Sequence, residues 1–239
     1  MHWLNEFLKF CRPVSRLTGS EWADAKRFIS LGTTAEPGPW RTYRTPYLQE
    51  PLDAATDKTT EKVVLMCASQ LGKSELLLNV LGYYADQEPS PQLMLQPTVE
   101  MAQAFSKERI APMFRDSPGL AGKLIEGKEG RGTEKKSSTT ILMKHYPGGF
   151  LALVGANSPA GLASRPIRIL LADEVDRYPE SAGKEGDPLK LAVQRTQNFG
   201  NRKLLMVSTP TVVGYSKIHN EFLAGDQREF VVRCPECCQ

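Results

Sequence analysis

Residues 63–74 decide the fold of this chain, and they read Val-Val-Leu-Met-Cys-Ala-Ser-Gln-Leu-Gly-Lys-Ser. The apolar run at the start predicts a strand buried on both faces, and the apolar spacing from Lys73 to Tyr84 predicts a helix after it. The end of this stretch matches the phosphate-binding pattern G-x-x-x-x-G-K-[ST], with Cys67 in place of the first glycine. A strand, a loop and a helix in this order are the structural context that the pattern requires.

The loop between this strand and this helix predicts a site for nucleotide phosphates. Backbone N–H groups after a buried strand can point at phosphate oxygens, and the positive end of the helix dipole favours anions. Lys73 can reach the β- and γ-phosphates, and the Ser74 hydroxyl can ligate Mg²⁺. The residues predicted to contact the nucleotide here are Ser69, Gln70, Leu71, Gly72, Lys73, Ser74 and Glu75.

A second apolar strand ends in two carboxylates and resembles a Walker B sequence. The run 167–172 is followed by Asp173 and Glu174. At the carboxyl end of a strand, Asp173 would hold Mg²⁺, and Glu174 would orient the attacking water or accept its proton. An acidic turn after a strand is common by itself. Downstream of a phosphate loop, however, it predicts an ATPase that uses ATP and Mg²⁺, with Lys73 and Glu174 as catalytic residues.

The remaining pattern alternates strands with helices, which favours a mostly parallel sheet with helices on both faces. Further strands are predicted at 92–96 and 204–208, a strand pair at 139–144 and 150–154, and a helix at 99–114 broken near Pro112. We therefore predict an α/β P-loop NTPase fold of the RecA-like class, in which a helical extension precedes the core. Residues 1 to about 35 are predicted to be helical, with an amphipathic segment at 21–29 that is capped by residues 18–21. The predicted parts are an N-terminal and adenine-side extension (1–50), an ATPase domain (51–233) and a linker start (234–239).

Two other segments are predicted to complete the nucleotide site. Ser208 and Thr209 follow a buried strand, where small hydroxyl residues can sense the γ-phosphate and couple hydrolysis to movement. The aromatic and basic segment 40–47 contains Tyr43 and Tyr47, which we predict on the adenine side, where aromatic rings can stack on the base. The same composition also fits an aromatic cluster packed on the core.

Composition bounds the class of protein without naming a partner. The chain has 239 residues, a net charge of +3 and 41% hydrophobic residues, so any contact with DNA must come from a local patch. No apolar run reaches the roughly 18 residues of a membrane span, so we expect a cytosolic protein without membrane contact. The Cys234-x-x-Cys237 turn is half of a common zinc site.

A basic loop is the candidate for contacts with DNA phosphates, although its composition also fits a solvated loop. Its basic residues are Lys123, Lys128, Arg131, Lys135 and Lys136.

The order of these motifs resembles the large terminase subunits of tailed bacteriophages, specifically the lambda type. The resemblance covers nearly the whole chain, and it rests on segments 21–25, 40–47, 67–74, 173–174 and 208–210 and on the closing Cys-Pro-x-Cys. It implies an ATPase with an additional catalytic glutamate, which moves double-stranded DNA into a procapsid in the host cytoplasm. It also implies a homo-oligomeric ring on the procapsid, with the portal protein and the small terminase subunit as partners. In that family a nuclease domain follows, and this chain ends near the junction, so we expect that it does not cut DNA by the family's mechanism.

The resemblance also raises the question of the catalytic arginine. Some relatives carry an arginine inside the phosphate loop, where this chain has Ser69 and Gln70, so slow basal turnover is expected. In other relatives an arginine just upstream of the Walker B strand takes this part, and Arg165 fits that place, with Arg168 and Arg177 as weaker candidates. A helicase-like ATPase acting on nucleic acid and a non-hydrolysing nucleotide-binding scaffold remain the alternative functions.

Overall fold

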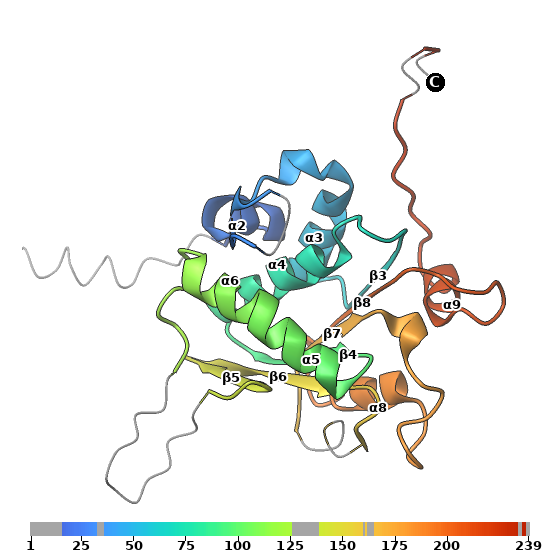
Figure 1. The fold of residues 1–239 in the computed structure, drawn as a ribbon. Coiled ribbons are helices and arrows are strands. Elements are labelled where there is room, and N and C mark those ends of the chain that lie inside the picture. The colour runs from blue at the N-terminus through green and yellow to red at the C-terminus, as the bar shows by residue number, and fades with distance from the viewer. Residues whose placement is uncertain are drawn as a thin grey trace, which may run out of the picture.

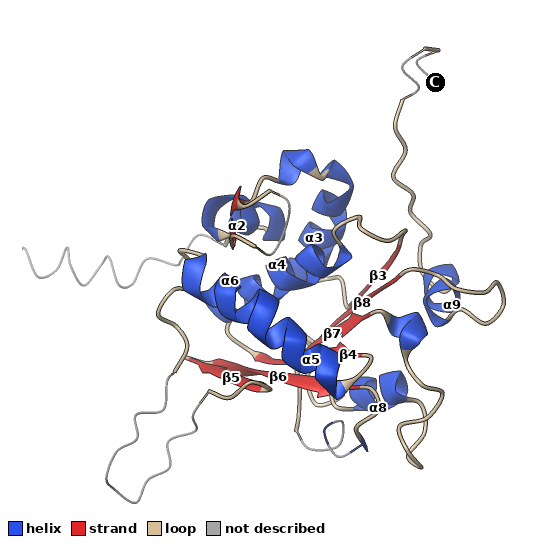
Figure 2. Ribbon diagram, viewed as in Figure 1, coloured by secondary structure: helices blue, strands red, loops and turns tan. Residues whose placement is uncertain are grey.

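The centre of the molecule is a six-stranded sheet covered by helices on both faces (Figures 1 and 2). The computed structural model describes residues 16–32, 36–125, 139–159, 161, 165–233 and 236–237. In spatial order the strands are β3 (Lys62–Met66), β8 (Lys203–Ser208), β7 (Ile169–Asp173), β4 (Pro91–Gln96), β6 (Gly149–Gly155) and β5 (Met143–Tyr146). All neighbours are parallel except β5, which is antiparallel to β6. The mostly parallel α/β sheet is thus confirmed. The strand pair at its edge is confirmed as well, but its first strand lies at Met143–Tyr146 and not at 139–144.

The strands are apolar throughout because both faces of the sheet are buried. In β7, Ile169 and Leu171 point into one core cluster, whereas Leu170 and Ala172 point into the other. All four side chains are fully buried. Side chains alternate between the faces of a strand, so a central strand covered on both sides reads as a continuous apolar run.

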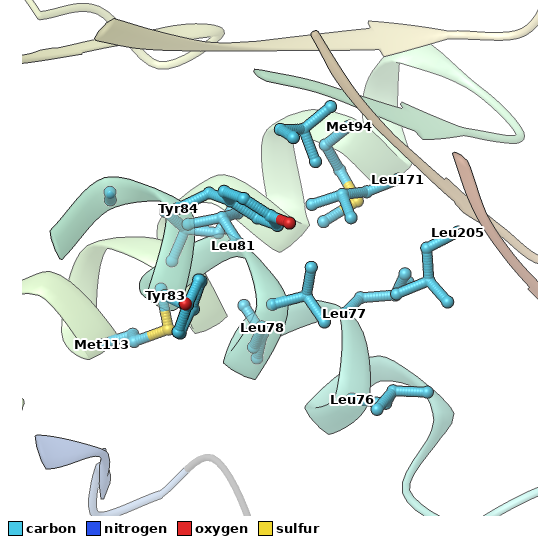
Figure 3. Close-up of a cluster of buried hydrophobic side chains, with 14 of the residues drawn as sticks. Leu76, Leu77, Leu78, Leu81, Tyr83, Tyr84, Met94, Met113, Leu171 and Leu205 are labelled. Carbon is cyan, nitrogen blue, oxygen red and sulfur yellow. The ribbon is translucent and has the colours of Figure 1, made fainter. Parts of the chain in front are cut away.

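The helix α4 (Lys73–Asp86) packs on the strands β7 and β8, and α2 (Gly19–Lys26) covers it from outside. Figure 3 shows Leu77 of α4 beside Leu171 and Leu205 of the sheet, whereas Tyr83 lies on the side of α4 that meets Met113. Every residue of this helix from Leu76 to Ala85 is buried, so burial on all sides holds it in place. Beside α4 on the same face, α3 (Gln49–Thr56) contacts β3 and β8, and α5 (Val99–Phe105), which is followed by α6 (Ala111–Asp116), contacts β4 and β6.

The predicted break near Pro112 takes the form of a wide helical turn before the proline. Residues Ser106–Ile110 form a π-helix between α5 and α6, and the chain remains helical from Val99 to Asp116. A proline inside a helix has no N–H and crowds the carbonyl four residues earlier. A π turn accommodates such a defect without ending the helix, so the expected break at Pro112 is corrected to this turn.

The N-terminal segment begins as predicted and then departs from the prediction. The Thr18 side chain accepts a hydrogen bond from the Glu21 amide, and the Glu21 side chain accepts one from the Thr18 amide, which confirms the cap of α2. The helix was expected to continue through residue 29, but it ends at Lys26. Residues Phe28–Ile29 instead form β1, which pairs with β2 (Gly38–Pro39). Residues 1–15, where helix was also expected, lie outside the described part.

The segment before the sheet packs on the same core as α4. Trp22, Trp40 and Leu48 are buried in the cluster that contains the α4 leucines, and the two short 3-10 helices η1 (Thr42–Arg44) and η2 (Pro46–Leu48) lead into α3. The predicted domain boundaries near residues 50 and 233 remain predictions.

On the opposite face of the sheet lie α8 (Pro188–Gln194) and α9 (Lys217–Leu223), together with the short helix η4 (Val175–Arg177). Leu189 of α8 and Ile218 of α9 are buried against this face. Across the described residues, no helix has the length and apolar character needed to cross a bilayer. Of the basic loop, Lys123 pairs with Asp86. The other four members, and the cysteines at positions 234 and 238, lie outside the described residues.

Candidate active site

Four strands deliver polar side chains to one edge of the sheet. Their carboxyl ends lie together because β3, β8, β7 and β4 are parallel neighbours. Met66 of β3 is paired with Ser208 of β8, and Asp173 of β7 is paired with Val207. In open parallel sheets, ligands bind at this edge. The loops after these strands hold most of the predicted site.

The phosphate loop bends sharply between β3 and α4. Gln70 and Gly72 both have positive φ, 62° and 80°, a conformation that glycine adopts without steric cost. A Cβ at Gly72 would also lie 2.9 Å from the Leu48 Cδ1 atom, so a side chain here would displace Leu48. Ser69, Gln70 and Leu71 are exposed, where a nucleotide can reach them. Cys67, at the position of the missing first glycine, is half-buried, and this burial raises the pKa of its thiol.

Lys73 is the buried centre of the site. Only 5% of its surface is exposed, and its Nζ donates hydrogen bonds to the Ala68 carbonyl at 2.9 Å and to the Thr209 Oγ1 atom at 2.7 Å. The Glu174 Oε1 atom lies 3.9 Å from the same Nζ. The three loops after β3, β7 and β8 therefore meet at one ammonium group. The sequence predicted these three positions independently of one another.

The environment of Asp173 suits a metal ligand. It is 4% exposed, and the Gln96 Nε2 group donates to its Oδ2 atom at 3.0 Å. Its buried Oδ1 atom has no hydrogen-bond partner among the described residues. Burial raises the pKa of this carboxyl to about 6, although the Gln96 hydrogen bond opposes the shift. An unpaired buried carboxylate oxygen is costly unless a cation or donor meets it, so Asp173 and the Ser74 hydroxyl fit the oxygen-rich coordination that Mg²⁺ prefers.

Glu174 is held in an unusual backbone conformation. Its φ and ψ are both 52°, in the left-handed region that residues with a side chain rarely adopt. Such a conformation persists only where neighbouring contacts impose it, and these positions cluster at active sites. The carboxylate lies between Lys73 and the exposed Arg177, whose Nε is 3.7 Å from its Oε2 atom. The glutamate is thus directed toward the phosphate loop, as a group that orients water must be.

Several predicted residues have other surroundings. The Glu75 carboxylate follows Ser74, but it is buried between Arg27, at 3.0 Å, and Arg109. Tyr43 is 78% exposed, whereas Tyr47 is half-buried, packs on the core and meets Phe230 edge-on at 6.0 Å between ring centroids. An adenine contact for either tyrosine remains a prediction.

The candidate arginines differ in position. The guanidinium of Arg165 lies over the Phe150 ring, 5.7 Å from its centroid, at the amino end of β6. Four strand spacings, about 19 Å, separate that strand from β3. Arg165 therefore does not reach the phosphate loop of its own chain. Arg168 is engaged with Ser90 and Glu88 at the amino end of the sheet.

One residue of the site, Gln96, and one residue beside it, Asp176, were missed by sequence reasoning. Gln96 ends a buried strand and contacts Asp173, so the rule that identified Asp173 and Ser208, a polar residue at the end of an apolar strand, also applies to it. Asp176 accepts hydrogen bonds from Thr211 and Ile218. No local pattern predicts that role, because its partners are 35 and 42 residues away.

Comparison with known proteins agrees with this arrangement. Residues 34–239 match the family model of the phage terminase large subunit gpA, ATPase domain. The terminase large subunits of Enterobacteria phage P21 and Escherichia phage lambda are each 26% identical to this chain over 225 residues. These alignments cover 92% of this chain and 34% of each relative, so the chain spans about a third of their length.

Two solved structures share the fold at low sequence identity. The HK97 bacteriophage large terminase superimposes with a TM-score of 0.63 at 14% identity, over 87% of this chain and 42% of that one. The large terminase ATPase domain of Thermus phage P74-26 gives a TM-score of 0.51 at 17% identity, over 76% of this chain and 72% of that one. Since the family model matches most of the chain, this protein belongs to the family of phage terminase large subunit gpA ATPase domains.

Proposed function

We propose that this chain hydrolyses ATP and that hydrolysis drives the movement of double-stranded DNA into a procapsid. The observation that carries the proposal is the position of Lys73, a buried ammonium between Thr209 and Glu174 at the mouth of the phosphate loop. A buried cation beside a turn of free backbone N–H groups suits a polyphosphate, and a carboxylate beside it suits activation of water.

Each residue has a defined part in this reaction. The loop 69–72 surrounds the phosphates, and Lys73 leaves Thr209 to neutralise the β- and γ-phosphate oxygens. Glu174 accepts a hydrogen bond from the attacking water and takes up its proton as the water oxygen bonds to the γ-phosphorus. The bond from that phosphorus to the β,γ-bridging oxygen breaks, and ADP leaves with this oxygen. Ser74 and Asp173 would hold Mg²⁺, which supplies charge neutralisation at the phosphates when bound. Tyr47 precedes Leu48, whose side chain lies near Gly72, and would be the tyrosine that covers the base.

The motor role extends the ATPase to DNA and to other proteins. The relatives are terminase large subunits, so we place this chain in a homo-oligomeric ring on the procapsid, with the portal protein and small terminase subunit as partners, in the host cytoplasm. DNA contacts would be to phosphates, because a translocating motor must move any sequence. We propose that residues 1–239 do not themselves cleave DNA.

Arg165 enters this proposal as a residue of the neighbouring copy. It contacts Phe150 of β6 and Met143 of the edge strand β5, on the side of the sheet away from β3. In a ring of copies it would then face the phosphates of the next subunit. An arginine supplied in this way is worth roughly 10³-fold or more in rate. Arg165→Ala would then keep nucleotide binding and lose only the ATPase activity that assembly stimulates. Equal stimulation of variant and wild type would remove Arg165 from the mechanism.

The test of the proposed function is ATP turnover by the purified chain over a range of protein and double-stranded DNA concentrations, beside Lys73→Ala. We expect slow turnover that rises with assembly and DNA, and no turnover in the variant. Nucleotide binding without turnover under every condition would support a non-hydrolysing scaffold instead. Separation of DNA strands would support the helicase-like alternative.

A further inference from the structure

One carboxylate outside the assigned nucleotide site connects three loops at the carboxyl edge of the sheet. Asp176 lies in η4, two residues after Glu174, and is half-buried. Its Oδ2 atom accepts hydrogen bonds from the Thr211 amide and hydroxyl, both at 2.9 Å. Its Oδ1 atom accepts one from the Ile218 amide at 2.8 Å, in the first turn of α9. Its own N–H donates to the Ser208 Oγ atom at 3.2 Å.

These contacts act directly on the turn that carries the catalytic glutamate. Glu174 has a left-handed backbone conformation, and the Arg177 amide donates to its carbonyl at 2.9 Å, which closes the turn. A residue with a side chain stays in this region of φ and ψ only when its surroundings over-determine it. On the downstream side, Asp176 supplies that constraint, because its side chain and its backbone are both anchored to other elements.

The anchoring carboxylate is charged at neutral pH. Burial raises its pKa, but the hydrogen bonds from Ile218, Ser216 and Thr211 lower it more, so the pKa of Asp176 lies below its ordinary value. Hydrogen bonds to a charged acceptor are roughly twice as strong as neutral ones. Ser216 and Ile218 are both buried, and α9 packs against β3 and β8. The residues of α9 that bind Asp176 are therefore themselves held by packing on the sheet.

The same loops also contact the ammonium of Lys73. Thr209, which accepts a hydrogen bond from Lys73, lies two residues before Thr211, which is bound to Asp176. A γ-phosphate that takes up Lys73 must compete with Thr209 for its protons. Thr209, Thr211, Asp176 and the first turn of α9 therefore form one connected path of contacts and chain neighbours beside Glu174.

We propose that Asp176 is a positioning residue for hydrolysis, which locks the turn of Glu174 onto the loop after β8 and onto α9. This inference rests on the proposed ATPase function. It assigns Asp176 a part in turnover and none in nucleotide binding, because none of its hydrogen bonds goes to the phosphate loop or to Lys73. It also makes the activity of Glu174 dependent on how α9 is held.

Asp176→Asn tests the proposal, because an amide has one acceptor oxygen and cannot serve both Thr211 and Ile218. We expect kcat to fall roughly 10- to 100-fold, as for small displacements of a catalytic group, with an unchanged Kd for ATP. Thr211→Val removes only the hydroxyl contact and should give a smaller loss of kcat, again without a change in Kd. Thermal unfolding of each variant shows how much of it is folded at the assay temperature.

Asp53→Asn is the matched control. Asp53 accepts two hydrogen bonds from Ser20, at 2.8 and 3.0 Å, which join α3 to α2 away from the site. This variant should lose a similar amount of stability and keep its kcat. If the wild type turns over ATP and both Asp176→Asn and Thr211→Val keep its kcat, this inference alone is overturned. The same holds if kcat falls by no more than the fraction of folded protein does. Absence of turnover in the wild type would overturn the proposed ATPase and this inference with it.

Discussion

Substitution of Glu75 by glutamine separates a structural role from a nucleotide-binding one. The residue follows Ser74, so the sequence places it with the nucleotide contacts, but its carboxylate is 10% exposed and pairs with two arginines. One of them, Arg27, is buried as well, with 3% of its side chain exposed. Burial lowers the pKa of Arg27, and the charge of Glu75 opposes this shift. Glu75→Gln leaves that guanidinium buried without its counter-ion.

The size of the effect follows from burial. Removing one partner of a buried ion pair costs about 3 to 5 kcal/mol. We expect the lower end, about 3 kcal/mol, because glutamine keeps one acceptor oxygen and Arg109 is partly exposed. For a domain of this size, that loss lowers the Tm by roughly 6 to 12 °C. Urea and thermal unfolding followed by circular dichroism measure the change, and titration with ATP measures the Kd, which should not change.

Glu50→Gln is the control for this experiment. It is the same substitution in an ion pair with Arg228 that is 67% exposed on both sides, and such pairs contribute little. If Glu75→Gln were as stable as Glu50→Gln, the structural role assigned to Glu75 would be wrong. A larger Kd for ATP at unchanged stability would instead indicate that Glu75 contacts the nucleotide.

Two further predictions concern the contact of α2 with α4. A Cβ at Gly82 would lie 2.2 Å from the Trp22 Cη2 atom, so Gly82→Ala should cost about 3 kcal/mol of stability through overpacking. This cost outweighs the roughly 1 kcal/mol that alanine gains in helix propensity. A thermal unfolding midpoint at or above that of the wild type would contradict this prediction. Burial raises the pKa of Asp86, but hydrogen bonds from two lysines, Trp22 and Gln87 lower it more, to below its ordinary 3.8. The stability that Asp86 contributes is therefore present above that ordinary pKa and lost as the pH falls below it. The free energy of unfolding, measured with urea across this range, should fall less steeply with acid in Asp86→Asn than in the wild type. The same pH dependence in both proteins would refute this role of Asp86.

The sheet and the three loops after β3, β7 and β8 could be predicted from the sequence because their signals are local. A buried parallel strand is a continuous apolar run, and each of the motifs at Lys73, Asp173 and Ser208 directly follows such a run. Parallel neighbours bring their carboxyl ends to one edge, so three separate motifs were sufficient to place one site.

The other features depend on contacts between residues distant in sequence. The ion pairs of Glu75 come from residues 48 positions before it and 34 after it, and no helical pattern around Lys73 predicts them. Arg165 was placed by its position before a strand, which does not say at which edge of the sheet that segment lies. The end of α2 at Lys26 was missed because residues 21–29 have helical apolar spacing, whereas pairing of β1 with β2 decides the conformation of Phe28 and Ile29.

The measurement that tests the central claim most directly is a comparison of ATP binding and ATP hydrolysis in wild type, Glu174→Gln and Lys73→Ala. Equilibrium titration gives the Kd, and single-turnover hydrolysis gives the rate of the chemical step. If Glu174 activates the water and Lys73 holds the phosphates, Glu174→Gln binds ATP as tightly as the wild type and hydrolyses it at least about 10²-fold more slowly, while Lys73→Ala loses binding. Hydrolysis at the wild-type rate by Glu174→Gln would contradict the account.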